Sequence, residues 1–176
     1  MDIVVDEWLP DYLRSREEVG IVIEVLKKIF EVCDSIAVME GSPFMRKIYR
    51  VLKESEHWND PAQILTVRYF IGRFLTNSEK MRRYRGISTN DLPKEVLEAI
   101  QDQKDLYLVA TLLHSLAQDR GGIILTTDAK LKKGSTGDIS RYIVLLKEFL
   151  KKYPFKRTLF RGGWENLARG GLLLPC

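Results

Sequence analysis

Cysteine, histidine, proline and long apolar runs are all scarce in this sequence, and their scarcity excludes several classes of protein. Its only cysteines, Cys33 and Cys176, lack the close spacing of a zinc site and the number needed for a disulfide framework. No stretch approaches the ~20 apolar residues of a membrane helix. The first residues also lack the basic and apolar segments of a secretion signal. We therefore expect a soluble, cytoplasmic protein without membrane association.

The rest of the composition is that of an ordinary globular protein. Apolar residues make up 45% of the 176 residues and charged residues 30%, and this length fits one compact domain with a core of its own. We assign residues 1–155 to that domain. Residues 156–176, with two Gly-Gly pairs, form a C-terminal extension that we expect to pack on the domain or to be partly disordered.

The net charge of +4 conceals a segregation along the chain. Residues 1–40 hold 4 basic and 10 acidic residues, a net −6, whereas residues 41–90 hold 10 basic and 4 acidic residues, a net +6. The remainder divides into a mildly acidic segment and a basic tail. Such a distribution suits a positive rim around an acidic pocket that processes a polyanion, but it also suits ordinary helix surfaces.

Hydrophobic periodicity predicts strands that alternate with helices. Short β-branched runs indicate strands at residues 2–5, 35–39, 123–127 and 142–145. Apolar residues at helical spacing, with Ser or Asp followed by Pro at two starts, indicate helices at residues 17–32, 43–53, 61–77, 93–100 and 105–116, and a short one ending near residue 151. Residues 79–93 read as a polar, basic loop. This alternation predicts a three-layer α/β/α sandwich with a central, mostly parallel sheet.

Carboxylates directly follow two of the predicted strands. Asp6 ends the first apolar run and Asp128 the third, while Asp105 opens the helix before the Asp128 strand. In an open parallel sheet the carboxyl ends of the strands form the crevice where ligands bind. Carboxylates brought together there repel one another unless a cation lies between them, and ligand sets made only of oxygen select Mg²⁺ or Mn²⁺.

Taken singly, each of these acids also has an ordinary structural interpretation. Asp105 would stabilise a helix start, Asp128 would cap a turn or helix, and Asp6 would be a strand-end acid. Their joint placement is therefore what predicts a divalent-metal site formed by Asp6, Asp105 and Asp128.

Two segments carry a resemblance to a known family. The run DLYLVA from Asp105, followed by GGIILTTDAKL from Gly121, resembles the C-terminal half of PIN-domain nucleases, where a helix-start aspartate precedes an apolar strand that ends Thr-x-Asp. The run IVVD ending at Asp6 resembles the family's first metal-binding aspartate, and residues 142–150 resemble its last strand and helix. The resemblance spans residues 2–150, and residues 56–90 fit it least.

The resemblance implies a function as well as a PIN-like fold. Such domains are metal-dependent ribonucleases, among them the toxins of toxin–antitoxin pairs and enzymes of RNA maturation and decay. For this chain it implies hydrolysis of RNA phosphodiester bonds with Mg²⁺ or Mn²⁺. It leaves open an antitoxin or another protein partner, and also a homodimer.

One departure from the family concerns a fourth acid. The family places a glutamate one turn into the helix after the second strand, where this sequence reads Phe44-Met45-Arg46-Lys47. Glu40, at the end of that strand, is the nearest substitute and completes the expected catalytic set with Asp6, Asp105 and Asp128. Asp138 is a candidate for the additional acid that some members carry.

A basic run with one aromatic residue is the candidate RNA-binding element. It contains Lys80, Arg82, Arg83 and Arg85 around Tyr84, a mixture that grips phosphates and stacks on bases in single strands. A solvated charged loop is the plainer interpretation.

Two alternatives to a nuclease remain open at this stage. The missing helix glutamate favours a catalytically inactive domain of the same fold that binds RNA or a protein partner. A phosphotransfer receiver would also gather acids at strand ends, and Asp6-Glu7 with Lys147 imitates its pattern loosely.

Overall fold

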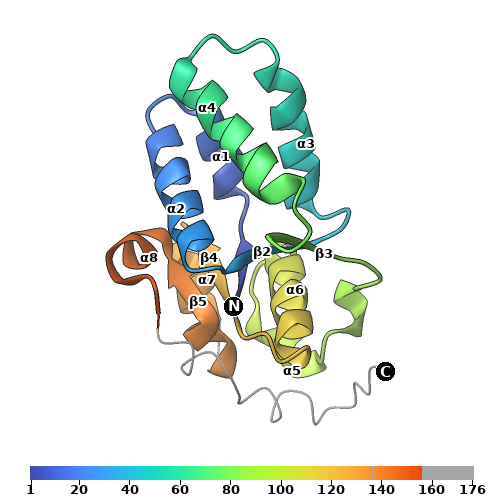
Figure 1. Cartoon of the computed structure of the whole chain (residues 1–176). Coiled ribbons are helices and arrows are strands. Elements are labelled where there is room, and N and C mark those ends of the chain that lie inside the picture. Colours follow the sequence, from blue (N-terminus) through green and yellow to red (C-terminus); the bar gives the residue numbers. More distant parts are fainter. Residues whose placement is uncertain (136, 156–176) are drawn as a thin grey trace.

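Five strands form one sheet at the centre of the computed structural model, which describes residues 1–135 and 137–155 (Figure 1). They are β1 (Asp2–Val5), β2 (Ser35–Met39), β3 (Met81–Tyr84), β4 (Gly122–Thr126) and β5 (Ile143–Leu145). Their order is β3-β2-β1-β4-β5, and each neighbouring pair is parallel. The apolar runs of β1 and β4 are buried throughout, as expected for strands covered on both faces.

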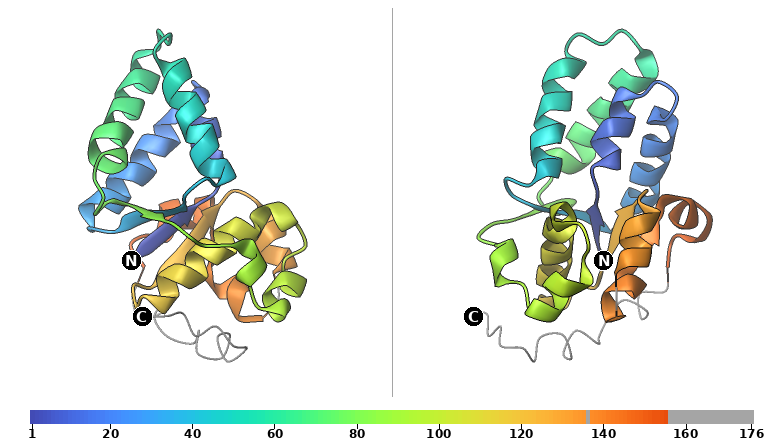
Figure 2. Two further views of the ribbon diagram at one scale, coloured as in Figure 1. Left: turned by 90° about the vertical axis from the view of Figure 1, so that its right-hand side faces the viewer. Right: turned by 180° about the vertical axis from the view of Figure 1, so that it is seen from behind.

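Helices cover both faces of this sheet. The α-helices are α1 (Trp8–Arg14), α2 (Val19–Glu31), α3 (Pro43–Ser55), α4 (Pro61–Phe70), α5 (Lys94–Ala99), α6 (Leu106–Ala117), α7 (Ala129–Gly134) and α8 (Leu146–Lys152). Helices α1 to α4 stand together on one side of the sheet, and α5 and α6 lie on the other (Figure 2). Helix α6 packs across β2, β1 and β4. The predicted three-layer α/β/α architecture is confirmed, and the sheet is parallel throughout.

Local start signals act as the sequence indicates. The Ser42 hydroxyl accepts a hydrogen bond from the Met45 amide, and Pro43 opens α3. The Asp60 carboxylate accepts one from the Gln63 amide at the start of α4. Helix α4 does not run unbroken to residue 77, because it passes into a π-helical turn, η1 (Ile71–Leu75). Short 3₁₀ turns complete the chain: η2 (Thr89–Asp91), η3 (Gln103–Asp105) and η4 (Gly137–Tyr142).

Three elements differ from the sequence prediction. Helices α1 and α7 were not anticipated, and strand β3 lies inside the predicted basic loop. The sequence of β3, Met-Arg-Arg-Tyr, lacks the apolar run of a buried strand, because β3 is an edge strand with one open side. The predicted C-terminal extension, residues 156–176, lies outside the described residues. Among the described helices, none is long and apolar enough to cross a membrane.

A buried carboxylate joins three strands and a helix at the amino end of the sheet. Asp2, at the start of β1, is 1% exposed. It accepts hydrogen bonds from Ser35 of β2 (2.7 Å), Tyr84 of β3 (2.6 Å) and Ser115 of α6 (2.8 Å). The Arg82 guanidinium of β3 pairs with it at 3.1 Å. This arginine supplies the charge that makes a buried aspartate tolerable.

Asp2→Asn tests that anchoring role. The amide replaces one acceptor oxygen by an NH₂ donor, which then faces groups that also donate. We expect the free energy of unfolding in urea to fall by about 2 to 4 kcal/mol. Asp91→Asn, at an exposed site in η2, is the control and should change it by less than about 0.5 kcal/mol. An unchanged unfolding midpoint in Asp2→Asn would contradict the role.

Candidate metal centre

Three aspartates gather at the carboxyl edge of the sheet. Asp6 follows β1 directly, Asp128 follows β4 by two residues, and Asp105 occupies the N-cap position of α6. Burial and then the charges of Asp6, Asp102, Asp128 and Glu7 raise the pKa of Asp105 to about 6. The structure therefore places Asp6, Asp105 and Asp128 near enough for their charges to interact, and a shared metal site of the three stays a prediction.

Thr126 links two members of this cluster. Its hydroxyl donates a 2.6 Å hydrogen bond to the Asp6 carboxylate and accepts one of 2.9 Å from the Asp128 amide. The other Asp6 oxygen accepts from the Glu7 amide at 2.5 Å. Burial still raises the pKa of Asp6, because these hydrogen bonds only partly offset the loss of solvent. One side chain thus sets the position of Asp6 relative to the Asp128 turn.

Asp105 and Asp128 differ in how they serve their helices. Asp128 caps α7, since its carboxylate accepts a hydrogen bond from the Lys130 amide at 2.6 Å. Asp105 stands at the N-cap of α6 but makes no side-chain capping hydrogen bond. Capping therefore does not account for Asp105.

A cavity of about 260 Å³ opens beside these acids. Asp102, Asp105 and Asp128 line it together with Lys130, and the remaining lining residues are Gln101, Leu131, Gly134 and Ser135. A space of this size holds several water molecules or one phosphate group with its hydration. The acids therefore border a space that a small ligand can enter.

Sequence reasoning missed two residues of the cluster. The charge of Glu7 raises the pKa of both Asp6 and Asp105. The hydroxyl of Tyr107, the second residue of α6, is buried and has no hydrogen-bond partner in the described structure. Burial and the charges of Asp6, Glu7 and Asp105 raise the pKa of Tyr107, so this unpartnered donor lies among the acids. The spacing Asp105-x-Tyr107 could have suggested it, but its burial depends on the packing of α6.

Lys47 occupies the region of α3 where the resemblance leads one to expect a glutamate. Its ammonium lies 2.7 Å from the Glu7 carboxylate and 3.0 Å from that of Asp11. Helix α3 therefore contributes a lysine that pairs with Glu7, the residue after Asp6, and not an acid of its own.

The two remaining predicted acids have other partners. Glu40 turns toward β3 and pairs with Arg85 at 2.5 Å. Asp138 in η4 lies 3.6 Å from Arg141. The charges of Glu40 and Asp138 do not contribute to the raised pKa of Asp105, whereas that of Glu7 does.

The predicted RNA-binding residues lie on the edge strand β3 and directly before and after it. Arg82 is committed to Asp2, and the Lys80 ammonium lies over the Phe30 ring at 5.2 Å from its centre. Arg83 and Arg85 are exposed. Arg85 pairs with Glu40, and Arg83 donates a hydrogen bond to the Leu75 carbonyl. All four cations thus have structural partners, and RNA binding by this run stays a prediction.

The acids suit Mg²⁺ or Mn²⁺ by their chemistry, since every donor is a carboxylate oxygen. In residues 1–135 and 137–155, no group of three or more His, Cys, Asp or Glu side chains is already arranged to hold an ion. Mg²⁺ commonly uses one or two carboxylates and keeps several water ligands. Asp6 and Asp128, which Thr126 links, are the two acids to consider for such a site. Comparisons with protein-family models, curated proteins and solved structures find no match to this chain.

The raised pKa of Asp105 predicts a pH dependence of stability without metal. Its pKa is about 6 in the folded protein and near 3.8 when unfolded, so the folded state binds the proton more tightly. Its contribution to stability is therefore present below pH ~4 and is lost as the pH rises through ~6. Asp105 is only half-buried, and solvent screening reduces the effect to about 1 kcal/mol.

The measurement is urea unfolding of the wild type and Asp105→Asn at pH 4.5, 6 and 7.5 with chelator present. We expect the variant to gain stability relative to the wild type as the pH rises, because the wild type alone must ionise this carboxyl. A constant difference between the two proteins across this range would exclude the repulsion.

Proposed function

We propose that this chain is a ribonuclease that uses Mg²⁺ or Mn²⁺ at the carboxyl edge of its sheet. The observation that carries the proposal is a cluster of acids without a compensating cation. Asp6, Asp105 and Asp128 share one edge, and no Lys or Arg of the described residues forms an ion pair with them. Asp2, at the other end of β1, has Arg82.

In this proposal Asp6 and Asp128 hold the ion, and Asp105 is the third acid of the set. A bound Mg²⁺ or Mn²⁺ supplies activation of water and neutralisation of charge on the scissile phosphate. Thr126 keeps Asp6 and the Asp128 turn in register.

The choice of RNA as substrate rests on the resemblance to PIN-domain nucleases described above. The cavity beside the acids accommodates a phosphate, and Lys130 on its wall offers a positive charge to it. No side chain has to act as a nucleophile, because water serves that role in metal-assisted hydrolysis.

A catalytically inactive domain of the same fold is the second candidate, and Lys47 is the observation that favours it. The lysine neutralises Glu7 where an acid is expected on α3. The receiver alternative loses its structural support, because receivers share the strand order 2-1-3-4-5, whereas this sheet has the order β3-β2-β1-β4-β5.

Asp128→Asn separates these functions when cleavage and metal binding are measured on the same samples. We expect Mn²⁺ to support cleavage of a fluorescent single-stranded RNA by the wild type and to raise its melting temperature. The variant should lose at least about 100-fold in rate, more than is typical of residues that only support metal ligands. Its melting temperature without metal should be unchanged or higher, since one source of repulsion is gone.

Glu98→Gln, on the exposed face of α5, is the control and should cleave like the wild type. Full activity of pure Asp128→Asn would refute its role. If Mn²⁺ stabilises the wild type but neither the wild type nor the two variants cleave RNA, the inactive domain is favoured.

A further inference from the structure

The edge strand β3 has an open side with backbone groups available for pairing. The amides of Ile36 and Glu40 in and after β2 donate to the carbonyls of Lys80 and Tyr84. In a parallel ladder alternate residues face the neighbouring strand, so Arg83 directs its own amide and carbonyl away from β2. Arg83 is exposed, and β3 has no partner on that side in the described structure.

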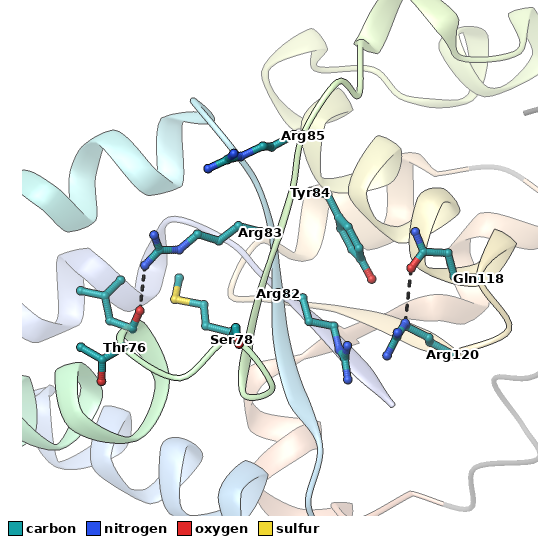
Figure 3. Close-up of a pocket in the computed structure, with 10 residues that line it drawn as sticks. Thr76, Ser78, Arg82, Arg83, Tyr84, Arg85, Gln118 and Arg120 are labelled. Carbon is teal, nitrogen blue, oxygen red and sulfur yellow. Dashed lines mark hydrogen bonds between the residues drawn. The ribbon is translucent and has the colours of Figure 1, made fainter. Parts of the chain in front are cut away.

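A cavity of about 500 Å³ runs along this open edge. Figure 3 shows that the side chains of β3 alternate across it, with Arg83 and Arg85 on the side of Thr76 and with Arg82 and Tyr84 on the side of Arg120. Arg120 and Gln118 come from the end of α6 and the turn that follows it. The lining includes four arginines and no carboxylate. We call this cavity the edge groove.

The arginines of the edge groove differ in their partners. Arg82 pairs with buried Asp2, and Arg85 pairs with Glu40. Arg83 donates to the Leu75 carbonyl at 2.8 Å, and Arg120 donates to the Gln118 side chain at 3.3 Å. Neither Arg83 nor Arg120 forms an ion pair with an acid of the described residues. The edge groove thus presents positive charge on both sides of a free strand edge.

We propose that the edge groove binds an extended acidic segment of another polypeptide, which adds to β3 as a sixth strand. An added strand would pair its main chain with the amide and carbonyl of Arg83. Its side chains would alternate toward the two walls of the groove, where acidic residues meet Arg83 on one side and Arg120 on the other. This inference is independent of the acids at the carboxyl ends of β1 and β4.

Two other occupants fit the groove less well. A second copy of this chain paired edge to edge would bring its own arginines against these, and like charges on paired strands repel. A single-stranded RNA would match the arginines, but it would not match the spacing of main-chain donors and acceptors along β3. Charge and backbone together therefore favour an acidic strand.

The test uses a labelled nine-residue peptide of Glu and Val, in which pairs of adjacent Glu residues place acids on both faces of the strand, followed by fluorescence anisotropy. Arg83→Ala removes the charge and keeps the amide. Arg83→Pro removes both, and proline is tolerated at this position because the amide faces away from the sheet. We expect Arg83→Ala to weaken binding about two- to fivefold and Arg83→Pro to weaken it about fivefold further. Melting temperatures near that of the wild type confirm that both variants are folded.

A Lys-Val peptide and a nine-nucleotide oligouridylate are the competing probes. The proposal expects neither to displace the acidic peptide. Absence of binding by the Glu-Val peptide, or equal binding to Arg83→Ala and Arg83→Pro, would overturn it. Displacement by oligouridylate that also depends on Arg83 would assign the groove to nucleic acid and overturn it as well.

Discussion

The Asp2 carboxylate accepts hydrogen bonds from Ser35, Tyr84 and Ser115 and pairs with Arg82. These four donors come from β2, β3 and α6, so one buried charge fixes the edge strand and the covering helix to the central strand. Without Arg82 this burial would carry a large electrostatic cost. The position of β3, and with it the edge groove, depends on this ion pair.

Asp6 is a second aspartate of this strand region, and it lacks an arginine partner. It stands about 13 Å from Asp2 along the same strand, at ~3.3 Å per residue, and it has one hydroxyl and one amide as donors but no arginine. Asp105 and Asp128 add negative charge nearby. The chain thus neutralises its acid at one end of β1 and accumulates acids at the other. A divalent cation bound there, as we propose, would reverse this cost.

Local patterns in the sequence were enough to predict the strands of the sheet interior and the acids that follow them. A few neighbouring residues were enough to predict strand β1 with Asp6 and strand β4 with Asp128. The same approach could not find β3, because Arg82 within it is explained only by its partner Asp2, eighty residues earlier in the chain. It placed Glu40 in the catalytic set, and the structure pairs this glutamate with Arg85. It also overlooked Glu7, whose setting depends on Lys47 of α3. Ion pairs between residues far apart in the sequence could not be predicted from the sequence alone.

The most direct test of the shared cation site is paramagnetic broadening by Mn²⁺ in the amide spectrum of the wild-type protein. We predict that substoichiometric Mn²⁺ first broadens the signals of Glu7, Asp105 and Asp128, which lie at the carboxyl edge of the sheet, beyond detection. The signals of Ser35 and Ser115, at the Asp2 end, should survive, because relaxation by Mn²⁺ falls steeply with distance. Broadening centred on any other surface, or none at millimolar Mn²⁺, would contradict the proposed metal centre.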